Sequence, residues 1–466
     1  MRRREFVRNA GLASVASLLE RRGIFAQDAA QALHGTLTID ERTVVATVPL
    51  DFMGLSYELA QLANPSFFAR ENEGLIGLVK DLGNHGVLRL GGGTSEFTTF
   101  TTEESSGPAP FDSVGPDTSK NIKADTAITP KSLRNLRAFL DATNWTCLYG
   151  LNLGRGSAPL AAEAAFHVQS ILGPRLIGFQ LGNEPDAWRN RYRPASWTYA
   201  DYWKEWAAAY AAVLTRVPQA KFAGPDVSNK MAYVTGFAED VKKSAPNVVM
   251  LTSHYYAMGP AGAKDVTLDK LLSPDPKLES NLKTAMDAAR GAGLPYRMCE
   301  GNSCWNGGQE GVSDTLASAL WVVDMMLEFA SGGSAGVNLH GGGDGFYTPI
   351  AGSVAKGFIR RPEYFGILFA RAFVGGTLVR STLECGNDKV RAYAGRKAGF
   401  LLVLVVNKSA QAVEINVPMR SAGQQWLLSG PAIEAKQDVT VARTEATALQ
   451  DGVLHVSPHS AVLIGV

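Results

Sequence analysis

Short apolar runs alternate with longer segments of helical periodicity over most of the chain. The runs have the length and composition of buried parallel strands, and the segments between them have the period of crossover helices. Eight runs are predicted as strands: Phe52–Glu58, Val87–Gly91, Thr146–Leu151, Ile177–Leu181, Phe222–Gly224, Val248–Tyr255, Tyr296–Glu300 and Ala335–His340. Eight such βα repeats predict a (β/α)₈ barrel. The alternative is an open doubly wound sheet, which is disfavoured because no Gly-x-Gly-x-x-Gly motif opens a helix after the first strand.

Two regions outside these repeats alternate in the manner of antiparallel strands. Residues 36–48 are predicted as a short hairpin that ends at Pro49. From about Phe373 onward, short β-type runs are divided by Gly, Asn, Asp and Pro, which predicts an all-β sandwich. The hairpin has no other sheet to join, so we expect it to complete this sandwich. The expected organisation is residues 33–48 and 374–466 in the sandwich and residues 49–373 in the barrel.

Residues 1–32 have the features of an export signal. Arginines at positions 2 and 3 precede an aromatic residue, an aliphatic residue and a modest apolar run at positions 10–19, which is typical of a twin-arginine signal. The run is too short to span a bilayer, and Ala-Gln-Ala at positions 30–32 is a small-x-small cleavage site. We predict export to the periplasm or the medium of a bacterium, with no stable membrane anchor. The alternative is a basic amphipathic helix that belongs to the fold.

Composition narrows the class of function. A formal net charge of +1 offers no overall attraction to nucleic acid or to an anionic membrane. The four cysteines fit neither a zinc module nor a disulfide framework, although a bridge between Cys299 and Cys304 is conceivable. Seven histidines show no metal-ligand cluster, so we expect neither a metal mechanism nor a bound cofactor. Nothing in the sequence indicates an oligomer, and we expect a monomer.

Two glutamates stand where an apolar strand opens into a loop. Glu184 follows the fourth predicted strand, and Glu300 ends the seventh. Functional groups of such barrels gather at the C-terminal ends of the strands, which places both carboxyls at one mouth. A carboxyl near another negative charge keeps its proton, so we assign Glu184 as acid/base and Glu300 as nucleophile. At about 5 Å apart the pair predicts a retaining glycosidase. The neighbouring Asn183 is expected to bind the sugar 2-hydroxyl, and a loop-capping or Arg189-pairing role for Glu184 is the alternative.

These motifs resemble a known clan. Asn183-Glu184 and Glu300 are similar to the catalytic strand ends of retaining glycosidases on (β/α)₈ barrels. Within that clan, four segments resemble heparanase and the microbial β-glucuronidases of glycoside hydrolase family 79: residues 52–58, 88–92, 94–96 and 300–303. The resemblance covers nearly the whole mature chain, including the C-terminal β-domain. It implies the same acid/base and nucleophile as the strand-end argument, and a carbohydrate substrate.

The same resemblance implies further binding residues. Tyr256 is similar to the tyrosine that hydrogen-bonds the nucleophile, with a plain barrel-wall aromatic as the alternative. Glu58 resembles a ligand of sugar hydroxyls, and an ion pair with Arg89 is equally open. His254 and His340 also lie at strand ends, where we expect them to be structural.

The loops that hold the sugar carboxylate in glucuronidases depart from the family pattern. Trp305 stands where a tyrosine is expected, and Phe346 stands where a small residue is expected, so hydrogen-bond donors are lost. Tyr347 and the backbone amides at Gly307 and Gly308 are retained. The predicted activity is therefore exo-acting β-glucuronidase, with a neutral-sugar glycosidase or a glycosidase for a modified uronic acid as the alternative.

Two other classes of function are alternatives to hydrolysis of a glycoside. A carbohydrate-binding protein without activity is disfavoured because both glutamates are present. A barrel hydrolase of amides would need a metal or a nucleophile triad, and no Gly-x-Ser-x-Gly elbow occurs. The long polar loop at residues 101–123 is expected to wall one side of the site and favour exo action.

Overall fold

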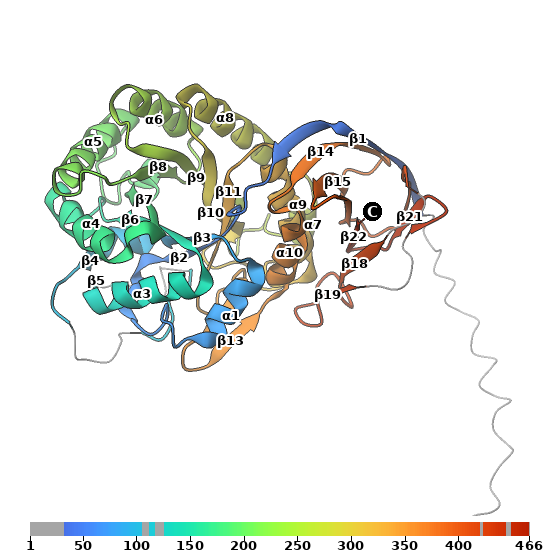
Figure 1. Ribbon diagram of the computed structural model, residues 1–466, viewed down its shortest axis with the longest axis horizontal. Coiled ribbons are helices and arrows are strands. Elements are labelled where there is room, and N and C mark those ends of the chain that lie inside the picture. Colours follow the sequence, from blue (N-terminus) through green and yellow to red (C-terminus); the bar gives the residue numbers. More distant parts are fainter. Residues whose placement is uncertain (1–31, 105–110, 117–124, 420–422, 444–448, 466) are drawn as a thin grey trace, which may run out of the picture.

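The computed structural model describes residues 32–104, 111–116, 125–419, 423–443 and 449–465, so the predicted export signal lies almost entirely outside the described residues. Eight parallel strands close into a barrel, which confirms the predicted fold class (Figure 1). In barrel order they are β2 (Met53–Glu58), β3 (Val87–Gly91), β6 (Thr146–Leu151), β7 (Leu176–Leu181), β8 (Phe222–Val227), β9 (Val248–Pro260), β10 (Tyr296–Trp305) and β11 (Gly336–Gly341). β11 pairs with β2 and closes the ring.

Helices cover the outside of this barrel. They are α1 (Glu73–Leu82), α3 (Pro130–Thr143), α4 (Ala158–Leu172), α5 (Tyr199–Arg216), α6 (Met231–Ser244), α7 (Leu268–Leu272), α8 (Pro276–Ala292), α9 (Leu316–Ser331) and α10 (Pro362–Ala370). Polar side chains fix where several begin, as at α5, where Thr198 and Asp201 form a reciprocal capping box. No helix within the described ranges is long and apolar enough to cross a membrane.

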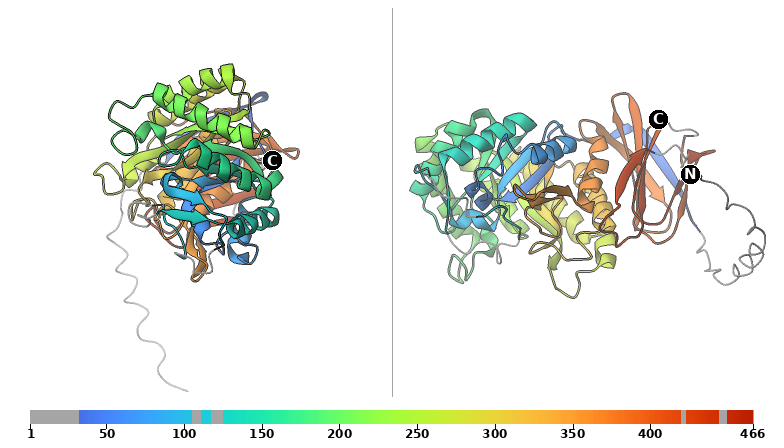
Figure 2. Two further views of the ribbon diagram at one scale, coloured as in Figure 1. Left: turned by 90° about the vertical axis from the view of Figure 1, so that its left-hand side faces the viewer. Right: turned by 90° about the horizontal axis from the view of Figure 1, so that it is seen from below.

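Ten further strands form one curled sheet beside the barrel (Figures 1 and 2). It contains β1 (Leu33–Thr47), β14 (Thr377–Glu384), β15 (Val390–Lys397), β16 (Phe400–Asn407), β17 (Val413–Asn416), β18 (Gln424–Ser429), β19 (Thr440–Arg443), β20 (Leu449–Gln450), β21 (Val453–Val456) and β22 (Ser460–Gly465). The sheet has an apolar core of its own, which includes Leu37, Val405, Ile415 and Ile464. β1 pairs with β14 and β17, so the N-terminal segment lies in the C-terminal sheet.

The predicted hairpin at residues 36–48 is wrong. β1 is a single strand that runs antiparallel to β14 from Thr36 to Thr47, and its register shifts between Asp40 and Val44 and between Val44 and Ala46. The Asp40 side chain accepts hydrogen bonds from the backbone N–H of Arg42 and the hydroxyl of Thr43. This local capping gives the polar residues the appearance of a turn, although the strand continues after the bulge.

Two short pairs of strands complete the described elements. β4 (Thr98–Phe100) pairs with β5 (Thr126–Ile128), and β12 (Ile350–Ser353) pairs with β13 (Gly357–Arg360). The predicted loop wall at residues 101–123 lies only partly within the described residues. Cys299 and Cys304 are both free and buried, so the conceivable disulfide between them is not formed.

A buried ion pair joins the barrel to the curled sheet. α9 is apolar on nearly all sides because α10 and the sheet both cover it. Asp324 on this helix lies 2.5 Å from Lys408 Nζ, and it also accepts a hydrogen bond of 2.6 Å from the Tyr393 hydroxyl. The side chains of Lys408 and Asp324 are 2% and 8% exposed. Burial opposes ionisation of Asp324, but Lys408 and Arg391 lower its pKa.

We predict that Lys408→Met lowers the free energy of unfolding by about 3–5 kcal/mol, because it leaves the Asp324 carboxylate buried without its cation. Urea-induced unfolding would measure the change. Lys283→Met is the matched control, since Lys283 pairs with Asp287 on an exposed helix face and its loss should leave stability nearly unchanged. A Lys408 variant as stable as the control would contradict the role assigned to the buried pair.

Candidate active site

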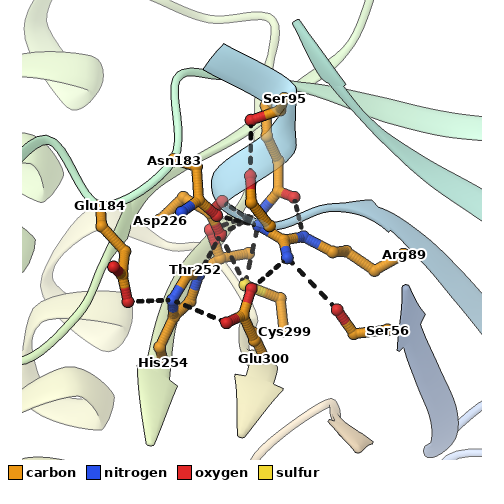
Figure 3. Close-up of polar contacts among 12 residues, drawn as sticks. Ser56, Arg89, Ser95, Asn183, Glu184, Asp226, Thr252, His254, Cys299 and Glu300 are labelled. Carbon is orange, nitrogen blue, oxygen red and sulfur yellow. Dashed lines mark hydrogen bonds and ion pairs between the residues drawn. The ribbon is translucent and has the colours of Figure 1, made fainter. Parts of the chain in front are cut away.

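Glu184 and Glu300 meet at the C-terminal mouth of the barrel. Glu300 lies within β10, and Glu184 follows β7 with a left-handed backbone (φ 51°, ψ 52°) held by a hydrogen bond from its N–H to the Asp226 carbonyl. One carboxylate oxygen of each glutamate and a ring nitrogen of His254 lie within 4.8 Å of one another (Figure 3). Arg189 donates its Nε–H to the Trp197 carbonyl instead of pairing with Glu184.

An arginine, two histidines and one tyrosine hydroxyl surround Glu300. Its Oε2 accepts a short hydrogen bond from Arg89 Nη1, and its Oε1 accepts one of 2.9 Å from the Tyr256 hydroxyl. Ring nitrogens of His254 and His340 lie 3.9 and 4.0 Å from its oxygens. Burial alone would raise the pKa of Glu300, but His340, His254 and Arg89 lower it to about 2. Glu300 is therefore ionised at neutral pH, as a nucleophile must be.

The pKa of Glu184 is shifted in the opposite direction to that of Glu300. Its side chain is 27% exposed, and Oε1 lies 3.1 Å from His254 Nδ1. Burial raises the pKa of Glu184, the charges of Glu300 and Asp186 raise it further, and only His254 opposes them. The net direction is upward, so Glu184 holds its proton to a higher pH than a free glutamate. The two glutamates therefore differ in ionisation, which suits one for proton transfer and the other for attack.

The guanidinium of Arg89, on β3, joins the strand ends together. It is fully buried and donates to Asp226 Oδ2 (2.6 Å), to Asn183 Oδ1 (2.7 Å) and to Gln180 Oε1 (3.0 Å), besides Glu300. A side chain at Gly91 would overlap the guanidinium, so glycine is required there. Arg89 is a site residue that was not predicted from the sequence. The available signal was a lone arginine inside an apolar strand, where a buried charge needs partners.

Hydrogen bonds fix both the backbone and the side chain of Asn183. Its backbone N–H donates a short hydrogen bond to Glu96, and its side-chain carbonyl accepts from Arg89, which leaves the amide Nδ2 as the group that can donate to a ligand. Glu96 also accepts the N–H of Leu153 at 3.1 Å. Burial raises the pKa of Glu96 to about 7 against the opposing effect of these backbone donors.

Glu58 lies in the wall of the site. Its Oε2 accepts hydrogen bonds from the Thr94 N–H (2.9 Å) and hydroxyl (2.7 Å), and Oε1 lies 3.5 Å from His340 Nε2. Among the described residues, the ion pairs of Arg89 go to Asp226 and Glu300, so the alternative pairing of Glu58 with Arg89 is not formed. Binding of sugar hydroxyls by Glu58 stays a prediction.

The loops after β10 and β11 form the outer part of the mouth. Trp305 is 45% exposed, whereas Tyr347 is only 1% exposed and its ring lies 6.3 Å from that of Tyr256. The Gly307 carbonyl accepts the N–H of Phe346 at 2.6 Å, which holds the two loops together. Beside them lies a cavity of about 700 Å³, lined by these loops and by residues 112–116. Trp305 is thus available to a ligand, while the Tyr347 ring lies beside Tyr256, which is hydrogen-bonded to Glu300.

Two groups of side chains have the spacing of metal ligands: Asp226 with His254 and Cys299, and Glu184 with His254 and Glu300. Both lie against the Arg89 guanidinium, which is 2.6 Å from Asp226 and bonded to Glu300. This fixed cation opposes the binding of a second one. We therefore assign the carboxylates to Arg89 and His254.

The chain matches no known protein-family model. A β-glucuronidase of Aspergillus niger is 27% identical over 465 residues, which cover 86% of this chain and 81% of that protein. A β-glucuronidase of Neurospora crassa is 27% identical over 342 residues, covering 64% of this chain and 57% of that protein. Among solved structures, a 4-O-α-L-rhamnosyl-β-D-glucuronidase from Fusarium oxysporum superposes with a TM-score of 0.73 at 16% identity, over 93% of this chain and all of that one. That likeness shows a shared fold.

We predict that Arg89→Met lowers the free energy of unfolding by about 3–5 kcal/mol at pH 7, because two carboxylates lose their shared cation. The lowered pKa values of Glu300 and Asp226 give stability that is present above about pH 4 and is lost as the pH falls toward 2. The difference between variant and wild type should therefore shrink at pH 3, as urea unfolding at both pH values would measure.

The matched control is Arg297→Met. Arg297 is equally buried but donates to Asn338 and to backbone carbonyls. Loss of Arg297 should lower the free energy of unfolding by nearly the same amount at both pH values. If Arg89→Met lowered the free energy of unfolding by the same amount at both pH values, the pairing of Arg89 with ionised Glu300 and Asp226 would be contradicted.

Proposed function

We propose that this protein is a retaining, exo-acting β-glycosidase in which Glu184 is the acid/base and Glu300 the nucleophile. The observation that carries the proposal is the pair of carboxyls at the barrel mouth, with oxygens within 4.8 Å and pKa values displaced in opposite directions. The two curated relatives support a β-glucuronidase-like glycoside hydrolase.

The separation of the two carboxyls favours the retaining pathway. Retaining enzymes place these groups about 5–5.5 Å apart, whereas inverting enzymes leave about 6.5–9.5 Å so that a water molecule fits between carboxylate and sugar. One oxygen of Glu184 lies within 4.8 Å of one oxygen of Glu300, which is closer than the inverting gap. This spacing supports direct attack by Glu300 on the anomeric carbon.

In the first step Glu300 forms an ester bond to the anomeric carbon while the glycosidic bond breaks. Glu184 gives its proton to the departing oxygen, so the aglycone leaves as a neutral alcohol. Tyr256 and Arg89 hold the two oxygens of Glu300 and orient the attack. The Asn183 amide is placed to donate to the sugar 2-hydroxyl, an interaction that strengthens as the transition state forms.

In the second step the now ionised Glu184 takes a proton from water. The resulting hydroxyl attacks the anomeric carbon, the ester bond breaks and Glu300 leaves as a carboxylate. Glu184 ends protonated, so the site returns to its starting state. Two inversions at the same carbon give net retention.

For the sugar, we favour β-linked glucuronic acid. The names of both curated relatives support this choice, and the backbone amides of the loop at Gly307 and Gly308 are the candidate donors to its carboxylate. One observation favours the alternative of a neutral or methylated sugar. Tyr347, the expected donor from the second loop, is 1% exposed beside Tyr256, and the exposed side chains there are Trp305 and Phe346.

We also propose membership of glycoside hydrolase family 79, from the motifs that resemble it. Export by the twin-arginine route, a monomeric state and the domain limits at residues 48 and 373 stay predictions from the sequence.

We predict that Glu184→Ala lowers kcat for a 4-nitrophenyl β-glycoside by about 10²–10⁴-fold, because general acid and base assistance are both lost. Added azide should restore turnover and yield the β-glycosyl azide, since azide attacks the ester without a base. Glu300→Ala with azide should yield the α-azide, and NMR of the products distinguishes the two. Glu239→Gln, on the exposed face of α6, is the control and should match wild type. Products of the opposite configuration would overturn the assignment of roles.

We predict that the mature protein releases 4-nitrophenol from the β-glucuronide with a higher kcat/KM than from the β-glucoside or the β-xyloside. The physical reason is that loop amides would pair with the carboxylate, which the neutral sugars lack. Preference for a neutral sugar would overturn β-glucuronidase while the two-glutamate mechanism stands. Release from none of the three, with sugar binding retained, would indicate a binding protein.

A further inference from the structure

Asp226 occupies a central position that the two-glutamate mechanism does not use. It follows the Gly-Pro of β8, has a left-handed backbone (φ 62°) and is 1% exposed. Both of its carboxylate oxygens are engaged. Oδ2 lies 2.6 Å from Arg89 Nη2, which holds the nucleophile, and Oδ1 lies 3.1 Å from His254 Nε2, which contacts the acid/base (Figure 3). One buried carboxylate thus contacts the partners of both catalytic glutamates.

His254, on β9, lies between Asp226 and Glu184. Its side chain is fully buried, with Nε2 3.1 Å from Asp226 and Nδ1 3.1 Å from Glu184. Other titratable groups face it from the neighbouring elements: Glu184 after β7, Asp226 on β8, and Tyr296, Cys299 and Glu300 on β10. Carboxyl groups therefore face both ring nitrogens.

The surrounding charge decides the protonation of this ring. Burial by itself lowers the pKa of His254, but Glu300 and Asp226 raise it well above its ordinary value. An imidazolium carries an N–H on both nitrogens, whereas a neutral ring carries only one. Nδ1 is hydrogen-bonded to Glu184, while Nε2 lies 3.1 Å from Asp226 as an ion-pair contact without the alignment of a hydrogen bond.

We propose that Asp226 is a positioning residue that keeps His254 protonated throughout the reaction, so that His254 stabilises Glu184 as an anion when Glu184 must act as base. This inference rests on the proposed function. Before attack, the two cations Arg89 and His254 are balanced by Asp226 and Glu300. Once Glu300 is esterified it carries no charge, and Glu184 becomes the second anion. Asp226 is the anion that is present in both halves of the reaction, which is why the role falls to it.

The charge of His254 affects the second half-reaction and the alkaline limb of the pH–activity profile. An imidazolium beside Glu184 lowers the pKa of this carboxyl against burial, Glu300 and Asp186. Without Asp226 the ring loses its proton more readily, the pKa of Glu184 rises, and Glu184 becomes a poorer source of the anion needed to activate water.

The test uses Asp226→Asn, because asparagine has the same shape and tolerates the left-handed backbone. We expect the alkaline limb of the kcat/KM profile for 4-nitrophenyl β-glucuronide, or for whichever glycoside the wild type hydrolyses best, to move up by about one pH unit. Slower release of the sugar should also give a pre-steady-state burst of nitrophenol. An unmoved alkaline limb without a burst would overturn the proposal, even if kcat falls.

Two further variants distinguish an effect of Asp226 that acts through His254 from a general loss of structure. His254→Gln should move the alkaline limb in the same direction, and the double variant should move it no further, because Asp226 acts through His254. Asp186→Asn is the matched control: Asp186 is 2% exposed and near Glu184, but its side chain accepts from Ser228 and backbone N–H groups rather than from His254. Since Asp186 raises the pKa of Glu184, this variant should move the limb down. Additive shifts for Asp226 and His254 would contradict the pathway.

A measurement on the unmodified protein keeps the test independent of folding and of activity. Nitrogen-15 shifts of His254, identified by their loss in His254→Gln, should show both ring nitrogens protonated at pH 8. A neutral ring at that pH would overturn the proposal. If the wild type hydrolyses no glycoside but His254 is doubly protonated, the proposed function has failed while the Asp226–His254 pair stands.

Discussion

The buried guanidinium of Arg89 is the interaction on which the active site depends. Removing a cation from water is costly unless carboxylates and hydrogen bonds surround it. Here those partners come from four other strand ends of the barrel, through Ser56, Gln180, Asp226 and Glu300. Residues that are far apart in the chain therefore all contact the Arg89 guanidinium. The same contact that offsets the burial of Arg89 also orients the group proposed to attack the sugar.

Two glutamates with the same chemistry are given different ionisation by their neighbours. Burial raises the pKa of both. For Glu300 it is outweighed by His340, His254 and Arg89, while for Glu184 only His254 acts in that direction and Glu300 and Asp186 act against it. The asymmetry is therefore a property of the charges around the mouth and not of either residue. It also links the two glutamates, because the charge of Glu300 contributes to the proton affinity of Glu184.

The curled sheet supports the barrel through α9. This helix presents Asp324 to Lys408 and Tyr393, and Glu328 to Arg391, in an interface whose other side chains are largely apolar. β1 extends the support to the beginning of the described chain, because it pairs with β14 before the chain enters the barrel at β2. The sheet therefore binds the chain on both sides of the barrel.

Local sequence determined the eight barrel strands and the position of Glu184 just after β7, whereas β10 continues past the predicted end at Glu300 to Trp305. Parallel strands buried on both faces are continuous apolar runs, and a polar residue at their end is conspicuous. The polar residues at 40–43 gave a wrong prediction of a hairpin, because a capped bulge within one strand resembles a turn. Only the tertiary structure decided the partners of Arg89 and Asp226, which are 137 residues apart, and the place of His254 between Asp226 and Glu184. Ionisation depends on which charges lie within a few ångströms, and barrel closure, rather than chain neighbours, sets those distances.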